Sequence, residues 1–191
     1  MNRFQNDDSD MKIVDVSGNV TEAFDTLEFL EQSRTHRFNG NMSRARNLGS
    51  NIVSAFSYKA APEEQELYAQ QLGITLDSDS VLQIKLLSVF TAEYCLETYL
   101  PAALSATAIT AMYDVLEDVS PDLYKAISAS LAFSYYYLCV RAGGDIAGKI
   151  GNRFATLCGH SGEDAFVKLG SGLFEINTGV YRKAIDGYAF V

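Results

Sequence analysis

Hydrophobic residues recur at three- and four-residue steps along most of this chain, which is the periodicity of an amphipathic α-helix. The clearest example is NMSRARNLGSNIVSAF, residues 41–56, whose apolar positions form one stripe that must face a core. The stripe consists of Met42, Ala45, Gly49, Ile52, Val53 and Phe56. The preceding segment TEAFDTLEFLEQSR, residues 21–34, repeats the spacing, and Thr21 is a suitable N-cap for it. Both segments are predicted to be helices.

Prolines and capping residues mark the boundaries of the later helices. Pro62, followed by two glutamates, predicts a helix start, because proline lacks the N–H that the first turn leaves unbonded. Residues 77–80 offer several N-caps for the next helix, and Pro101 predicts its end, since the residue before a proline resists helical geometry. Ser161 and Asp164 have the spacing of a capping box for the last helix. These signals predict helices over residues 62–73, 81–100, 101–119, 121–141 and 162–188.

The fold class follows from this pattern of helices. Those over residues 101–119 and 121–141 are apolar on most of their circumference, so we expect them at the centre of a bundle. Only the start of the chain differs: residues 12–20, KIVDVSGNV, are rich in β-branched residues, yet one strand alone cannot form a sheet. The sequence therefore predicts an all-α protein in which residues 21–191 form a single-domain bundle of about seven helices. Residues 1–20 are predicted to form an extended arm or a short strand.

The formal charge of −9 narrows the classes of partner. Duplex nucleic acid and acidic membrane surfaces both require clustered cations, so we expect neither as a direct partner. An acidic protein of this kind is suited to cover a basic surface of another protein. Cys95, Cys139 and Cys158 are odd in number and lie in apolar runs, which favours buried thiols in the reducing cytoplasm. No apolar window is long enough to cross a bilayer, and the acidic N-terminus is unlike a signal peptide.

One stretch, LCVRAGGDIAGKIGNRF over residues 138–154, has the glycine and lysine spacing of a phosphate-binding P-loop. Gly143 is followed after four residues by Gly148 and Lys149. A working P-loop also needs a preceding strand and a Ser or Thr after the lysine. Here Ile150 follows the lysine, and the preceding residues continue a helical pattern. The stretch is therefore not expected to bind a nucleotide.

The same stretch has the spacing of a helix face without large side chains. Such a face lets a second helix approach closely, and close packing compensates for the roughly 1 kcal/mol by which each glycine weakens a helix. The second helix belongs either to the same chain or to a second copy. The residues predicted on this packing or self-association face are Gly144, Ala147, Gly148 and Gly151.

Residues 33–46, SRTHRFNGNMSRAR, are the one electropositive segment that this acidic sequence itself defines. No acidic residue lies between Glu31 and Glu63. The forked donors of guanidinium match phosphate and carboxylate, so the arginines predict an anion-binding site. The alternative is that they pair with the protein's own carboxylates at the surface. The candidate ligand-binding residues are Arg37, Arg44, Arg46 and His36.

Cys158 and His160 combine a thiol with an imidazole, and Glu163 and Asp164 follow them. Such a cluster could supply a nucleophile or a metal site, but the pair straddles a glycine at a helix end, so the two side chains need not meet. Cys158 is therefore expected in the core. The sequence contains no catalytic motif and no paired metal-ligand motif, and we expect no metal and no cofactor.

Three consecutive tyrosines, residues 135–137, point in different directions around their helix, so at least one must reach a polar boundary or a hydrogen-bond partner. With other tyrosines they could line a cavity, although an aromatic-rich core is the commoner arrangement. The other tyrosines are Tyr94, Tyr99, Tyr113 and Tyr124.

These features predict a non-catalytic, cytoplasmic helical protein that acts by protein–protein contact. Its role would be regulatory or inhibitory binding, and it would self-associate as a homodimer. The alternative hypothesis is a small-molecule binder or an enzyme, with a pocket between helices that recognises an anionic ligand through the arginines of residues 33–46.

Overall fold

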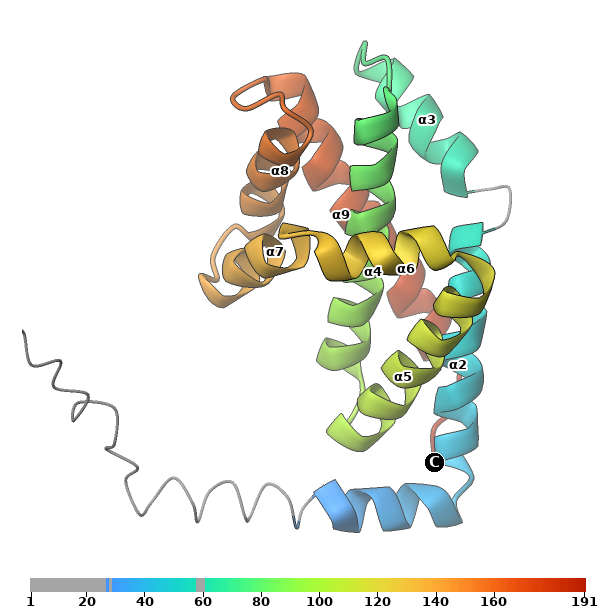
Figure 1. Ribbon diagram of the computed structural model, residues 1–191. Helices are drawn as coiled ribbons and strands as arrows, with labels where there is room; N and C mark the ends of the chain where they lie inside the picture. The colour runs from blue at the N-terminus through green and yellow to red at the C-terminus, as the bar shows by residue number, and fades with distance from the viewer. Residues whose placement is uncertain (1–26, 28, 58–60) are drawn as a thin grey trace, which may run out of the picture.

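A computed structural model describes residue 27 and residues 29–57 and 61–191 (Figure 1). Every regular element in these residues is helical, which confirms the predicted all-α class. A first helical segment covers residues 29–38. The helices after it are α2 (Asn41–Ser57), α3 (Ala61–Gln71), α4 (Ser78–Tyr99), α5 (Ala102–Val119), α6 (Pro121–Ala129), α7 (Ala132–Arg141), α8 (Ile146–Leu157) and α9 (Asp164–Asp186). The Thr21 cap and the arm over residues 1–20 lie outside the described residues.

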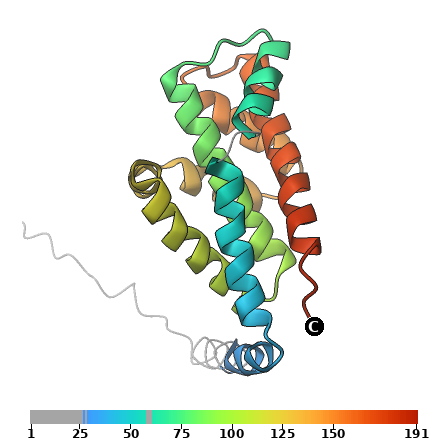
Figure 2. The same ribbon diagram turned by 90° about the vertical axis from the view of Figure 1, so that its right-hand side faces the viewer.

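Helices α4 and α9 run side by side through the centre of the molecule (Figures 1 and 2). The first half of α4 packs against α7, α8 and the start of α9, where Phe90, Tyr136 and Phe154 are fully buried. The second half packs against α2, α5 and the end of α9, around buried side chains such as Leu96 and Met112. The hydrophobic core therefore has two parts, joined through α4 and α9.

The number and placement of helices differ from the prediction. The described residues form nine helices instead of about seven, partly because the helix predicted over residues 121–141 is two, α6 and α7. Ser130 has an extended backbone with ψ 142°, and its Oγ accepts a hydrogen bond from the Ala132 N–H at 3.0 Å. This local bond replaces a helical one, without any glycine or proline to mark the break. The expected central position is also wrong for α6, which contributes no fully buried side chain.

The predicted start of α4 is confirmed, whereas the predicted start of α9 is wrong. Asp77 caps α4 by accepting a hydrogen bond from the Ser80 N–H at 2.8 Å. Hydrogen bonding from Ser80, through its side chain and its backbone N–H, lowers the pKa of Asp77 below its usual value. The capping box predicted at Ser161 does not form. Helix α9 begins at Asp164, because Gly162 has a φ of +82°, which is incompatible with a helical turn.

Glycines permit two close helix crossings. A Cβ built on Gly49 of α2 would overlap the carbonyl group of Ala108 on α5, so the two backbones touch there. A Cβ on Gly151 of α8 would lie 3.0 Å from the Ser171 nitrogen on α9 and still closer to the Val167 carbonyl oxygen. Within the described residues, no helix has the length and apolar character needed to cross a membrane.

Candidate functional site

The glycine-rich stretch forms the corner between α7 and α8. Gly143 and Gly144 have positive φ values of 59° and 68°, which turn the chain at the end of α7. Asp145 is the N-cap of α8, and its carboxylate accepts a hydrogen bond from the Gly148 N–H at 2.9 Å. Lys149 donates hydrogen bonds to the carbonyl oxygens of Ala142 at 3.3 Å and of Gly143 at 2.5 Å. The lysine of the P-loop-like spacing therefore caps the end of a helix.

The predicted small-residue face is not continuous. Gly144 lies in the turn outside α8 because of its positive φ. Gly148 faces the Asp145 carboxylate, which a Cβ would displace, so this glycine serves the helix cap. Only Gly151 meets another helix backbone, that of α9 in the same chain, while Ala147 is partly buried against the core.

A hollow of about 390 Å³ lies beside this corner, between α7, α8 and the loop that follows α8. None of its lining residues is acidic, although the chain has a net charge of −9. Arg153 lies over the Tyr135 ring, 5.7 Å from its centroid, and Lys149 is the second cation. The lining residues are Leu138, Cys139, Ala142, Lys149, Asn152, Arg153, Thr156, Ser161 and Gly162.

Most polar groups of this hollow are engaged with the backbone around them. Asn152 donates to the Gly148 carbonyl oxygen at 2.7 Å, and Thr156 donates to the Asn152 carbonyl oxygen at 2.9 Å. Burial raises the pKa of the Cys139 thiol above its usual value, and the nearby Arg153 and Lys149 partly oppose this effect. The hollow thus presents positive charge, while the Asn152 and Thr156 donors are bonded to nearby backbone.

An exposed apolar ridge on α7 adjoins the hollow. Leu131, the N-cap of α7 with helical backbone angles, and the helix residues Tyr135 and Leu138 have the spacing i, i+4 and i+7, which places them on one side of the helix. Leu131 is 66% exposed and Leu138 is 58% exposed, and Leu138 also lines the hollow. We call this ridge, together with Lys149 and Arg153, the α7–α8 face. The spacing was visible in the sequence, but the helix was expected to be buried on several sides, so its exposed side was missed.

The structure separates the arginines of the predicted anion site. His36 and Arg44 both bond to the buried side chain of Asn41: Asn41 Nδ2 lies 3.1 Å from His36 Nδ1, and Arg44 donates to Asn41 Oδ1 at 3.0 Å. Asn41 also bonds to the backbone of Val191. Arg37 is exposed and forms no ion pair with any described residue.

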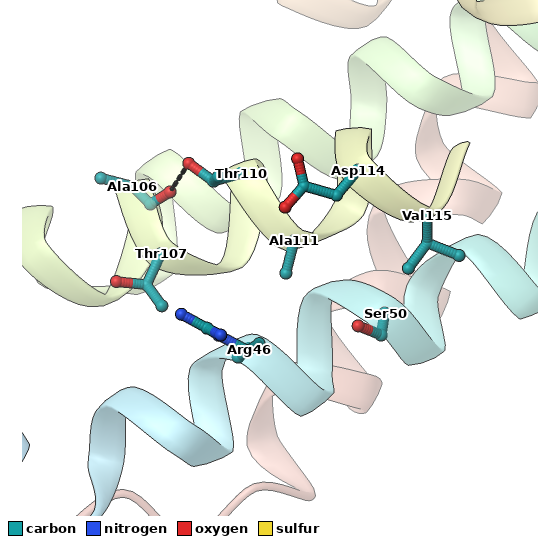
Figure 3. Close-up of a pocket in the computed structure, with 8 residues that line it drawn as sticks. All are labelled: Arg46, Ser50, Ala106, Thr107, Thr110, Ala111, Asp114 and Val115. Carbon is teal, nitrogen blue, oxygen red and sulfur yellow. Dashed lines mark hydrogen bonds between the residues drawn. The ribbon is translucent and has the colours of Figure 1, made fainter. Parts of the chain in front are cut away.

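Arg46 lies apart from these residues, in a groove of about 410 Å³ between α2 and α5. Figure 3 shows its side chain extending toward Thr107 on the opposite helix. Arg46 forms no ion pair in the described part of the chain, including with Asp114, which lines the same groove. Thr110 donates to the Ala106 carbonyl oxygen at 2.8 Å, so its hydroxyl proton is already used. The remaining lining residues are Ser50, Ala106, Thr107, Ala111 and Val115.

Cys158 and His160 do not form a pair. Burial raises the pKa of the Cys158 thiol to about 12, so the thiolate that a nucleophile needs is absent at neutral pH. The His160 ring stacks on Phe166 with 3.7 Å between centroids, and its Nδ1 lies 3.0 Å from Glu163 Oε1. Among the described residues, no three His, Cys, Asp or Glu side chains are grouped closely enough to hold a metal ion.

A carboxylate that the sequence did not single out holds two of the tyrosines. Glu93 on α4 accepts hydrogen bonds from Tyr137 of α7 at 2.5 Å and from Tyr113 of α5. Burial and the Glu93 carboxylate raise the pKa of both hydroxyls, which remain protonated donors. Of the three consecutive tyrosines, Tyr136 is fully buried and Tyr135 is exposed. Glu93 therefore joins three helices and is best explained as a structural residue.

Over the described residues the geometry defines an all-α protein, whose helix surfaces include the hollow beside α7 and α8 and the groove between α2 and α5. No family model matches the chain, and no curated protein and no solved structure is significantly similar to it. Its function is therefore argued from its own surfaces.

Proposed function

We propose that this protein acts without catalysis, in the cytoplasm, by binding a segment of another protein on its α7–α8 face. The observation that carries the proposal is an exposed apolar ridge beside a cationic hollow without acidic residues. Exposed apolar patches rimmed by polar groups are typical of protein interaction sites. The cytoplasmic location is supported by the three free cysteines, all of which are buried.

Local charge defines the chemistry of the partner. The net charge of −9 favoured a partner with a basic surface, but the α7–α8 face presents Arg153 and Lys149 next to Leu131 and Leu138. A segment that carries apolar and acidic side chains on one side complements this face. Burial of the ridge would supply affinity, at about 25 cal/mol for each Å² of apolar surface removed from water.

We expect the double substitution Leu131→Ser/Leu138→Ser to abolish recovery of partner proteins from a lysate of the source cells, with the melting temperature unchanged. The physical reason is that both side chains are exposed, so their loss removes apolar contact without opening a cavity. The measurement is quantitative mass spectrometry of proteins retained by the immobilised full chain. The matched control is Ile176→Ser/Val180→Ser, which removes two exposed apolar side chains from α9.

The proposal requires that proteins retained by the wild type and by the α9 control are lost with the α7 variant. A synthetic acidic, apolar segment of such a protein should then bind the wild type, and Arg153→Glu should weaken that binding. Equal recovery by all three proteins would refute the assignment of the α7–α8 face.

A second candidate function is binding of a small ligand in the groove between α2 and α5. It is favoured by Arg46, which has no ion-pair partner among the described residues, and by Asp114 in the same groove. A ligand with both an anionic and a cationic group fits these two charges. We expect amino acids or related zwitterions to raise the melting temperature of the wild type and not of Arg46→Ala, with Arg37→Ala as the control. A panel of such compounds without effect on the wild type would eliminate this function.

A further inference from the structure

The segment that contains Leu27 and the helix over residues 29–38 projects from the bundle. Gly40, with a φ of +72°, separates this helix from α2 and turns it away (Figures 1 and 2). No described side chain from residue 27 to residue 38 is fully buried. A helix of this length is only marginally stable in water by itself, since most helical stability in proteins comes from packing of an apolar face. A partner that covers the helix would supply that packing.

The exposed side of this helix is apolar at both ends. Leu27 is 59% exposed, Leu30 is 56% exposed and Phe38 is 93% exposed. At 100° per residue, these three side chains share one side of the helix with Glu31 and Arg34. The positions from 27 to 38 extend along about 17 Å at 1.5 Å per residue. This stretch is long enough for a contact of about three helical turns.

The order of residues on this side is self-complementary. Leu27 and Phe38 are equally far from the point midway between residues 32 and 33, and so are Glu31 and Arg34. If two copies of the helix pair in antiparallel orientation about a two-fold axis at that point, Leu27 meets Phe38 of the other copy and Glu31 meets its Arg34. Each contact then occurs twice. Within one chain, Glu31 and Arg34 form no ion pair with any described residue, so both charges are available.

We propose that this protein dimerises through antiparallel pairing of the segment formed by Leu27 and the helix over residues 29–38. Charge complementarity selects a second copy as the occupant, because a parallel pair would place the two Arg34 side chains against each other. A membrane surface fits less well, since Glu31 lies on the apolar side and the whole chain is acidic. The surface is separate from the α7–α8 face, so this inference does not rest on the proposed binding function.

The paired area is small beside the roughly 1,600 Å² of a standard stable interface, so we expect a dissociation constant in the micromolar range or weaker. Sedimentation velocity of the full chain, measured from low to high micromolar concentration, should show a reversible monomer–dimer equilibrium. Phe38→Ser should abolish the dimer and leave the urea midpoint of the helical bundle unchanged, because Phe38 is 93% exposed and contributes nothing to the core. Leu67→Ser, which removes an exposed leucine of α3, is the matched control and should leave the dimer intact.

Charge exchange tests the orientation directly. Glu31→Arg and Arg34→Glu should each weaken the homodimer by about tenfold, because each variant places like charges together at two positions. A mixture of the two variants should form a heterodimer of wild-type strength, since every facing pair is then opposite in sign. The double variant Glu31→Arg/Arg34→Glu should again form a homodimer.

Three outcomes would overturn the proposal: a monomer at every concentration, a dimer that neither single charge variant weakens, or no gain on mixing the two variants. The last would show that the charges do not face each other across the contact. If the monomeric chain instead co-sediments with vesicles of phosphatidylcholine and phosphatidylserine, and Phe38→Ser prevents this, the helix binds lipid and the proposal fails.

Discussion

Replacement of Gly49 with alanine is expected to lower the free energy of unfolding by about 3 kcal/mol and the melting temperature by roughly 6–12 °C. The added Cβ would lie 2.8 Å from the Ala108 carbonyl carbon and closer still to its oxygen. These are backbone atoms of α5, which cannot rotate away as a side chain can. The helices α2 and α5 must therefore move apart, and the contacts of Leu48 and Val53 in the second part of the core weaken with them.

The matched control for this substitution is Gly179→Ala. Gly179 is an exposed residue of α9, and a Cβ there has no neighbour within 4 Å. Alanine should stabilise this helix by about 0.5–1 kcal/mol, because glycine loses more backbone entropy when it becomes helical. Urea denaturation of the wild type and both variants measures the two effects. If Gly49→Ala unfolds at the same urea concentration as the wild type, the close crossing of α2 and α5 is wrong.

The second large effect is expected for Glu93→Ala, which should lower the free energy of unfolding by about 3 kcal/mol. Two tyrosine hydroxyls, those of Tyr113 and Tyr137, lose a charged acceptor, and both are substantially withdrawn from water. The change also removes the link between α4, α5 and α7. Thermal or urea denaturation followed by circular dichroism provides the measurement.

Glu97 supplies the control for Glu93, because it is one turn away on α4 and, among the described residues, accepts a hydrogen bond only from Tyr137, at 3.1 Å. Burial, with the neighbouring Glu93 carboxylate, raises the pKa of Glu97 in the folded state. A raised carboxyl pKa means that the folded state binds the proton more tightly than the unfolded state does. Protonated Glu97 therefore stabilises the folded state in acid, and this stabilisation is lost as the pH rises through the pKa of Glu97 in the folded state. Glu97→Gln should therefore leave stability at neutral pH unchanged or slightly increased. Equal losses for Glu93→Ala and Glu97→Gln would contradict the central role of Glu93.

The sequence by itself determined the class of fold and most helix boundaries. Apolar residues at three- and four-residue steps can be buried only if the chain is helical, and this local rule identified α2 along its whole length. Pro101 and Asp77 bound α4 by backbone constraints that act within a few residues. The break between α6 and α7 at Ser130 was not predicted. It depends on one hydrogen bond to the serine side chain, and many serines within helices could form such a bond.

Only the tertiary structure decided which sides of the helices are covered and which charges meet. Helices α4 and α9 occupy the centre because both parts of the hydrophobic core include side chains from each of them. The hydrophobic periodicity of a central helix does not differ from that of an apolar helix at the edge of the bundle, so the sequence does not identify the central helices. The arginines at 44 and 46 are neighbours in sequence, yet they diverge, because side chains two residues apart on a helix point to different sides. Lys149 and Arg153 form a candidate binding face only together with the exposed ridge on α7. The turn at Gly143 and Gly144 brings that ridge beside them. Surfaces of this kind depend on contacts between distant segments, and sequence spacing alone does not encode them.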